Sequence, residues 1–303
     1  MYDTIIVGGG PGGITAAIYA ARKKLNFLFL TKDIGGQTLW SSDIENYTGY
    51  HNISGAKLIE KFIEHMKDYK IDVKEDEPVK SISKKGDNFT VNTEKGAYEA
   101  RSIIITSGKK PRKLNVPGEK EFEGKGVAYC ATCDAPLFQD LDVVVVGGGD
   151  SGFDAALQLS KYTNKIYLIN KDEKINNSDV ALRENALKTG KLEVLNKSAV
   201  KEIKGDKFVN KVIIEQDGKK KELNVSGVFI EIGYVPNTDF CKDLVKLNQG
   251  NEIIIDKANK TSAEGVFAAG DVTDIPGKQT IIAAGEGAKA LLNCYEYLAR
   301  RNK

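Results

Sequence analysis

The sequence predicts an α/β protein built from two copies of one strand–helix–strand unit. A β-branched apolar stretch, Thr4 to Val7, runs directly into Gly8-Gly9-Gly10-Pro11-Gly12-Gly13, and an Ala-rich helical run and a second strand follow. The same pattern returns at Val143 to Val146 and Gly147-Gly148-Gly149-Asp150-Ser151-Gly152, and the two copies align without a gap. An internal repeat of this kind favours two Rossmann-like domains over one extended sheet.

The first glycine run has the chemistry of a phosphate cradle. Gly8, Gly10 and Gly13 form a G-x-G-x-x-G motif between a predicted strand and a predicted helix. Glycine lets the main chain approach a pyrophosphate, and the helix N-terminus supplies N–H donors and positive partial charge. In this strand–turn–helix context the motif predicts dinucleotide binding.

The remaining elements predict how the two domains are completed. Alternating apolar residues indicate a β-meander over Val79–Ile82, Phe89–Asn92 and Ala97–Ala100, and a buried strand follows at 103–105. A similar succession over Val212–Gln216 and Val225–Ile232 follows the second glycine run, and a last helix is expected from about Thr280 to Ala299. We therefore expect two Rossmann-like dinucleotide-binding domains, each in three layers (ββα). The first is discontinuous, comprising 1–110 and 241–303, and the second comprises 111–240.

Composition limits the function classes. The 303 residues include 44 Lys and Arg against 42 Asp and Glu, a formal net charge of +2, so no basic excess points to nucleic acid. No apolar run approaches the ~18 residues of a membrane span. The chain opens Met1-Tyr2-Asp3 and enters a strand at once, so no signal peptide is expected. With only four cysteines, we expect a cytoplasmic protein with no nucleic-acid or membrane partner.

Two of those cysteines form the motif Cys130-Ala131-Thr132-Cys133-Asp134. A C-x-x-C pair can close into a small disulfide, with a thiol pKa lowered to about 7 in thioredoxin-type motifs, or it can supply half of a zinc site. Zinc needs two further ligands, commonly Cys or His, at close spacing. The remaining candidates are distant and unpaired in sequence: Cys241, Cys294, His51 and His65. A redox dithiol and no metal are therefore expected, with Cys241 and Cys294 as ordinary buried cysteines.

The chain resembles the low-molecular-weight thioredoxin reductases, FAD enzymes of the pyridine nucleotide-disulfide oxidoreductase superfamily. The resemblance rests on the Gly8 fingerprint, Gly35-Gly36-Gln37, Ile44-Glu45-Asn46-Tyr47, Thr106-Ser107-Gly108, the C-x-x-C motif and Gly270-Asp271-Val272. It extends from residue 1 to about residue 300. It implies a homodimeric flavoprotein that reduces thioredoxin.

The resemblance also implies a set of site residues. Cys133 should face the flavin, Cys130 should attack the partner disulfide, and Asp134 should manage the proton. Asp271 should hydrogen-bond the ribityl–phosphate end of FAD, and Trp40 follows the Gly-Gly-Gln segment near the expected flavin pocket without an assigned role. The complete set expected to line FAD is Gly8, Gly10, Pro11, Gly13, Gly35, Gly36, Gln37, Asn46, Thr106, Gly108, Gly270, Asp271, Gln279, Thr280 and Ile281.

The sequence departs from this family where the electron donor would bind. Members that use NADPH carry a His-Arg-Arg segment and a further Arg after the second-module strand. Here that stretch is Asn170 to Asn176, with Asp172 in place of one Arg and no arginine before Arg183. Lys171 alone lacks the bidentate fork that suits a phosphate, and Asn170 is not the acid that a 2′-hydroxyl favours.

This departure resembles the ferredoxin-linked flavin branch of the family, so reduced ferredoxin is the expected donor. A ferredoxin near −400 mV reducing a thioredoxin near −270 mV gains roughly 6 kcal/mol over two electrons. Acidic ferredoxins favour a basic docking face, for which Arg22-Lys23-Lys24 and Lys109 to Lys113, expected as an exposed crossing, are candidates. Two alternatives stay open: an NADPH- or NADH-dependent thioredoxin reductase, and a non-enzymatic FAD-binding redox sensor.

Overall fold

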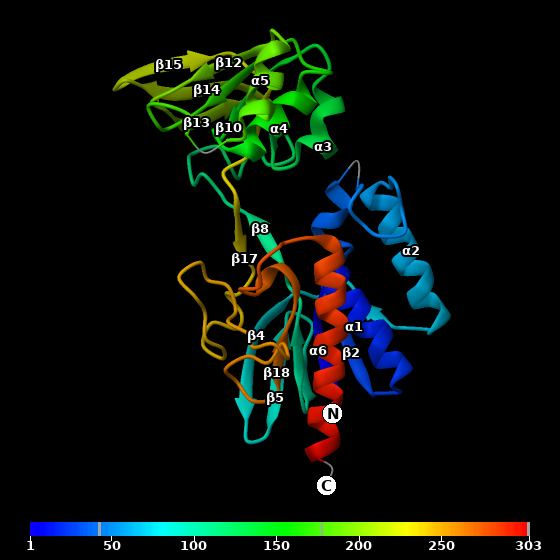
Figure 1. Ribbon diagram of the computed structural model, residues 1–303. Coiled ribbons are helices and arrows are strands. Elements are labelled where there is room, and N and C mark those ends of the chain that lie inside the picture. The colour runs from blue at the N-terminus through cyan, green and yellow to red at the C-terminus, as the bar shows by residue number, and fades with distance from the viewer. Residues whose placement is uncertain (42–43, 177, 302–303) are drawn as a thin grey trace. The chain divides into compact units, whose positions relative to one another are not determined.

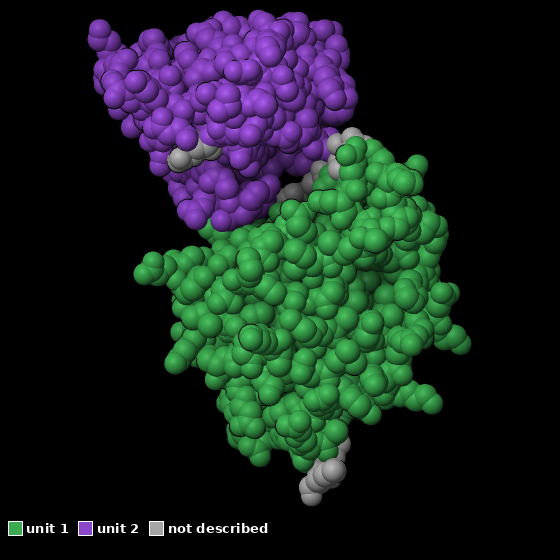
Figure 2. Space-filling model, viewed as in Figure 1, with its two compact units in different colours: residues 1–110, 235–303 green, residues 111–234 purple. Residues whose placement is uncertain are grey.

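A computed structural model describes residues 1–41, 44–176 and 178–301, and it divides the chain into two compact units (Figures 1 and 2). Unit 1 comprises residues 1–110 and 235–303, and unit 2 comprises residues 111–234. The chain crosses between them along two short strands that pair with each other, β8 (Lys109–Pro111) and β17 (Tyr234–Pro236).

The second boundary differs from the one expected from sequence. Residues 235–240, expected in the second domain, group with unit 1. Thr238 donates a hydrogen bond to the main-chain oxygen of Asn251 (3.0 Å), and Phe240 packs against the unit 1 core. These contacts link distant parts of the chain, which explains why local pattern did not reveal them.

Unit 1 is organised around a five-stranded parallel sheet with the strand order β18-β7-β1-β2-β3. Its strands are β1 (Thr4–Gly9), β2 (Phe27–Ile34), β3 (Val73–Lys74), β7 (Ile103–Ile105) and β18 (Val266–Ala268). Successive side chains of a strand point to opposite faces. Accordingly Ile5 and Val7 join one core cluster, and Ile6 joins another.

Each face of this sheet is covered by a different layer. An antiparallel sheet of β4 (Val79–Lys85), β5 (Asn88–Thr93) and β6 (Ala97–Ala100) packs on the Ile5 face. Helices pack on the Ile6 face: α1 (Pro11–Arg22), α2 (Gly55–Asp68) and α6 (Thr280–Arg301). Two short 3₁₀ turns, η1 (Gly36–Trp40) and η3 (Gly270–Val272), complete the unit.

Unit 2 repeats this architecture. Its parallel sheet has the order β12-β11-β10-β16-β9 and contains β9 (Val127–Ala128), β10 (Asp142–Val146), β11 (Lys165–Ile169), β12 (Leu192–Leu195) and β16 (Gly227–Ile230). Val144 and Val146 face the antiparallel sheet of β13 (Ser198–Gly205), β14 (Val209–Gln216) and β15 (Lys219–Leu223). Val143 and Val145 face the helical side, with α3 (Ala131–Asp134), η2 (Ala135–Phe138), α4 (Asp150–Leu159) and α5 (Val180–Lys188) in this unit.

The predicted fold class is confirmed: two Rossmann-like modules, each with a parallel sheet between helices and an antiparallel sheet. The predicted meander and the long last helix are present, while α2 and α5 were not predicted. Within the residues that the structure describes, no helix combines the length and apolar character needed to cross a membrane.

Candidate active site

The first glycine loop joins β1 to α1 by a turn in which the main chain is crowded. Gly8 has φ +110°, and a Cβ there would lie 2.5 Å from the Thr106 carbonyl oxygen. A Cβ on Gly13 would lie 1.8 Å from the Gly8 oxygen. Thr106 ties this turn to the neighbouring strand, because its hydroxyl donates to the main-chain oxygens of Val7 (3.0 Å) and Gly8 (2.8 Å).

The loop presents the N-terminus of α1 to an open space. The N-cap is Gly10, which has no side chain to cap the first-turn N–H groups, and a Cβ on Gly10 would meet no described atom within 4 Å. Pro11 takes the first helical position, where its missing N–H costs no helical hydrogen bond. Free N–H groups at a helix N-terminus form an anion site that suits a pyrophosphate.

The other residues expected at FAD lie at the same edge of the unit 1 sheet. Thr106 follows β7, Gly8 is the second-last residue of β1, and Gly270 lies just after β18. Three adjacent parallel strands therefore bring these residues to one carboxyl edge. The N–H of Gly35 donates to the Gly9 oxygen (2.8 Å), and Gly36 lies against Gly10.

Side chains connect the glycine-rich segments to the last helix. Asn46 donates to the Gln279 side-chain oxygen (3.0 Å), and the Thr38 and Thr280 hydroxyls lie 3.2 Å apart. Gln37 donates to the main-chain oxygen of Lys109 (2.7 Å). Thr38 was not predicted from the sequence, although it is adjacent to the Gly35-Gly36-Gln37 motif. Ile281 lies in the first turn of α6, and Gly108 accepts a hydrogen bond from the N–H of Asn237 (2.9 Å).

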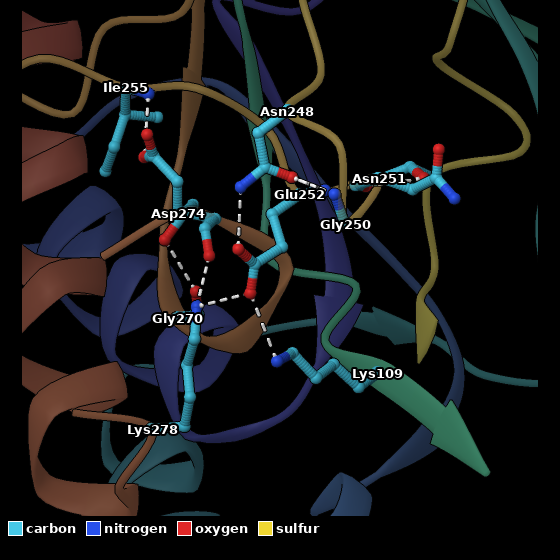
Figure 3. Close-up of polar contacts among 11 residues, drawn as sticks. Lys109, Asn248, Gly250, Asn251, Glu252, Ile255, Gly270, Asp274 and Lys278 are labelled. Carbon is cyan, nitrogen blue, oxygen red and sulfur yellow. Dashed lines mark hydrogen bonds and ion pairs between the residues drawn. The ribbon is translucent and has the colours of Figure 1, made fainter. Parts of the chain in front are cut away.

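Asp271 is a half-buried carboxylate in η3 at this edge. Burial raises its pKa, while Lys109 and Lys278 act in the opposite direction and Glu252 adds to the rise. Lys109, Glu252 and Lys278 form a charged cluster that was not predicted from the sequence (Figure 3). Their positions in the chain are far apart, so no local motif could have revealed them.

The expectation that Lys109 to Lys113 form an exposed basic crossing is corrected in part. The Lys109 side chain is only 19% exposed and pairs with Glu252 at 3.2 Å. Lys110 pairs with Asp239 (2.7 Å), and Lys113 pairs with Glu123 (3.0 Å). Acidic side chains therefore neutralise much of this segment. The side chain of Trp40 lies outside what the structure describes.

In unit 2, Cys130 and Cys133 form a disulfide with their Cα atoms 5.4 Å apart. Cys130 is the N-cap of α3, and its sulfur accepts the N–H of Cys133 at 3.2 Å. Asp134 ends α3 half-buried, and burial raises the pKa of its carboxyl. Cys241 and Cys294 are buried in the unit 1 core, as predicted.

The residues between the two cysteines contact an acidic network. Thr132 donates to the Gln158 side-chain oxygen (2.7 Å), and the Gln158 amide donates to Asp154 (2.7 Å). The Glu231 carboxylate accepts the main-chain N–H of Ala131. Burial raises the pKa of Glu231 to about 7, nearby Asp154 adds to the rise, and the Ala131 N–H opposes it. Glu231 was not predicted as a site residue, because it follows a strand distant in sequence from the cysteines.

The second glycine loop has the same backbone architecture as the first. Gly147 has φ +133°, and a Cβ there would lie 2.1 Å from the Glu231 main-chain oxygen. A Cβ on Gly152 would lie 1.9 Å from the Gly147 oxygen. The helix that follows begins with an acid, Asp150, whose carboxylate accepts the N–H of Asp179 (2.6 Å).

Asn170, at the end of β11, uses its side-chain amide for hydrogen bonds within unit 2. Its amide donates to the main-chain oxygen of Asp172 (3.1 Å) and to the side chain of Asn196 (2.8 Å). Lys197, beside this turn, pairs with Glu173 at 2.8 Å. The strand end itself therefore carries no acid for a ribose and no arginine for a phosphate. In the segment that follows, Arg183 of α5 donates to the main-chain oxygen of Ile175 (3.2 Å).

Two Rossmann-like modules, one presenting an open glycine cradle and the other carrying a C-x-x-C disulfide, define a two-domain disulfide oxidoreductase. A family model described as pyridine nucleotide-disulphide oxidoreductase matches residues 2–288. The chain belongs to this family. Membership implies FAD binding. The open cradle at Gly10 fits a pyrophosphate.

Curated relatives match the whole chain but are longer. "NADH dehydrogenase" of Bacillus subtilis is 40% identical over 99% of this chain and 59% of its own length. A component of alkyl hydroperoxide reductase from Staphylococcus aureus is 38% identical with the same coverage. The chain thus spans about 59% of the length of these relatives.

Solved structures match over their full length. Thioredoxin reductase of Lactococcus lactis is 34% identical with a TM-score of 0.87, covering 99% of this chain and 100% of that one. A ferredoxin-flavin thioredoxin reductase of Clostridium acetobutylicum is also 34% identical, with a TM-score of 0.57 and 99% and 98% coverage. The fold is that of low-molecular-weight thioredoxin reductases, and identity does not favour the ferredoxin-linked branch.

Proposed function

We propose that this chain is a flavin-dependent disulfide reductase that passes two electrons through the Cys130–Cys133 pair to a thioredoxin-type protein. The observation that carries the proposal is the disulfide itself, which joins the only two cysteines of unit 2 within the described part of the chain. FAD, held by the first glycine loop and by the residues around Asp271, would supply the electron pair that reduces this disulfide.

The cysteines then carry out thiol–disulfide exchange. The Cys130 thiolate attacks one sulfur of the partner disulfide, and the other partner sulfur leaves as a thiolate and takes a proton. Cys133 attacks the resulting mixed disulfide at the Cys130 sulfur, which re-forms the Cys130–Cys133 bond and releases the partner as a dithiol. Asp134, whose pKa is raised by burial, is the carboxyl that holds or returns the proton at these sulfurs.

A nicotinamide nucleotide is the first candidate for the electron donor. The comparisons support this alternative better than the ferredoxin that we expected from sequence, because thioredoxin reductases and a protein named NADH dehydrogenase match the whole chain. The second glycine loop also keeps the backbone geometry of a nucleotide cradle.

Reduced ferredoxin is the second candidate, and the side chains of unit 2 favour it. The loop is flanked by the acids Asp150, Asp154 and Glu231, and Asn170 replaces the acid that would bind a ribose. Negative charge beside an anion cradle weakens phosphate binding. Thioredoxin as acceptor and a homodimeric assembly, both implied by the resemblance, belong to the same proposal.

Anaerobic reduction of the FAD-loaded protein tests the proposal and separates the donors. NADH, NADPH and reduced ferredoxin are each mixed with the protein while the flavin absorbance is followed, and thioredoxin reduction is then measured with insulin. Rapid bleaching by a nucleotide selects the first candidate, and bleaching by ferredoxin alone selects the second.

Cysteine variants test whether the chain is an enzyme or a redox sensor. Cys130→Ser and Cys133→Ser should abolish thioredoxin reduction, and Cys133→Ser should trap a Cys130 mixed disulfide. Cys241→Ser, a buried cysteine of unit 1, is the matched control and should retain turnover. Full turnover by Cys130→Ser would contradict the reductase proposal and leave the sensor alternative.

A further inference from the structure

A charged cluster in unit 1 holds two lysines on one carboxylate (Figure 3). Lys109 and Lys278 both place their ammonium groups 3.2 Å from the same Glu252 oxygen, Oε1. The other oxygen, Oε2, accepts the Asn248 side-chain amide at 2.8 Å. We call Lys109, Glu252 and Lys278 the Glu252 cluster. Its carboxylate is satisfied on both oxygens.

The Glu252 cluster is sheltered from solvent. Its side chains are 19 to 25% exposed, whereas those of the surface pair Lys80–Glu94 are 54% and 69% exposed. The Asn248 side-chain oxygen fixes the Glu252 turn by accepting the N–H groups of Gly250 (2.8 Å) and Glu252 (2.9 Å). Charges in partly buried positions are less screened by water and salt than surface charges.

Each lysine of the cluster is connected to residues expected at FAD. The main-chain oxygen of Lys109 accepts the Gln37 side-chain amide (2.7 Å). Lys278 bonds the Thr273 main-chain oxygen and directly precedes Gln279, whose side chain accepts from Asn46 (3.0 Å). Both lysines of the cluster therefore belong to segments that contact residues expected at FAD.

The cluster also sets the charge beside Asp271. Burial raises the pKa of this carboxyl, both lysines lower it and Glu252 raises it, so all three charges of the cluster act at Asp271. Two cations and one anion give the cluster a formal net charge of +1, opposite in sign to the Asp271 carboxylate.

We propose that the Glu252 cluster tunes the midpoint potential of the bound flavin. It does so through its net positive charge, which lies next to segments expected to contact FAD. Reduction adds negative charge to a flavin, so a more positive surrounding favours the reduced form. Glu252→Gln leaves an extra positive charge and should raise the potential. Lys109→Met and Lys278→Met leave an extra negative charge and should lower it. The inference rests on the proposed function, because it requires FAD in the first module.

Equilibrium reduction of the FAD-loaded protein against a reference dye tests this inference. We expect each variant to shift the equilibrium constant for flavin reduction by about tenfold, which is 29.6 mV for a two-electron couple. The shift should be upward for Glu252→Gln and downward for the lysine variants. Glu94→Gln and Lys80→Met, in the exposed pair of the same unit, are the matched controls and should leave the constant unchanged.

A double variant separates charge from structural damage. Glu252→Gln with Lys278→Met restores the net charge and should return the constant to that of the parent protein. If Glu252→Gln loses flavin, recovery of flavin in the double variant supports the charge balance, and loss in both overturns it. Shifts of the same sign in all single variants, or no shift, would also overturn the inference. Failure of the parent protein to bind FAD would instead contradict the proposed function.

Discussion

The two glycine loops share a backbone and differ in charge. In both, the first glycine has a positive φ and approaches the main-chain oxygen that follows a neighbouring strand, Thr106 in unit 1 and Glu231 in unit 2. In both, the last glycine of the motif lies against the first. A Cβ added to the last glycine would lie 1.8 Å (unit 1) or 1.9 Å (unit 2) from the main-chain oxygen of the first. Backbone geometry therefore does not distinguish the two loops.

The side chains around the loops are different in kind. Pro11 and Thr15 of the first loop correspond in the repeat to Asp150 and Asp154 of the second. The Thr106 hydroxyl occupies the strand end in unit 1, where unit 2 has the Glu231 carboxyl. In the first loop none of these three positions carries an acid beside the N–H groups of the helix N-terminus. In the second loop all three positions carry a carboxyl group.

A G-x-G-x-x-G motif therefore predicts the backbone geometry of the loop, but it does not by itself predict which ligand the loop binds. The helix N-terminus attracts an anion through its N–H groups and dipole, an effect of about 0.3–1 kcal/mol at an exposed site. A nearby carboxylate opposes a phosphate by a similar or larger amount. The same backbone can therefore serve as a dinucleotide cradle in one module and as a support for the Cys130–Cys133 pair in the other.

Matched glycine variants should show the largest difference between the loops. Gly8→Ala and Gly147→Ala both place a Cβ at positive φ and against a carbonyl oxygen, so each should destabilise its own unit by at least about 2 kcal/mol. Gly8→Ala should also lose bound flavin, whereas Gly147→Ala should keep it. The ratio of flavin absorbance to protein absorbance in purified protein measures this. Equal flavin loss in both variants would contradict the assignment of FAD to the first loop.

Local motifs predicted both glycine loops and the cysteine pair, because each depends on residues that are adjacent in sequence. The Glu252 cluster and the contact of Glu231 with Ala131 could not be predicted in this way. Both bring together residues that are distant in the chain, and their pairing depends on tertiary structure. Exposure of Lys109 was wrongly predicted for the same reason, since its acidic partner lies in another segment. Lys110, Arg112 and Lys113 are exposed, as predicted for this crossing.

Neutralising Glu231 should change the stability of unit 2, and the change should depend on pH. Burial and Asp154 raise its pKa from the ordinary 4.5 to about 7, so the folded protein binds more protons than the unfolded chain between these values. Stability should therefore fall as pH rises through this window, by up to about 3 kcal/mol. Tyr234 also faces Glu231, but burial raises the pKa of its phenol, so it stays neutral there.

Glu231→Gln should remove this pH dependence. We expect the variant to be more stable than the parent at pH 8 and close to it at pH 4, as measured by chemical denaturation at both values. Glu193→Gln, at an exposed ion pair of the same unit, is a suitable control. A variant less stable than the parent at pH 8 would show that the Glu231 carboxylate stabilises unit 2 in its charged form.

Removing the acids of the second loop should have the smallest of these effects, on nucleotide affinity. Each carboxylate near the cradle opposes a phosphate by about 1 kcal/mol at an effective dielectric between those of protein and water. The double variant Asp150→Asn, Asp154→Asn should therefore bind NADH roughly thirtyfold more tightly. The gain should shrink at high salt because these acids are exposed. Titration of NADH at two ionic strengths measures both. An unchanged affinity would mean that charge does not distinguish the loops, and that the hydrogen-bonded Asn170 end of β11 sets nucleotide binding instead.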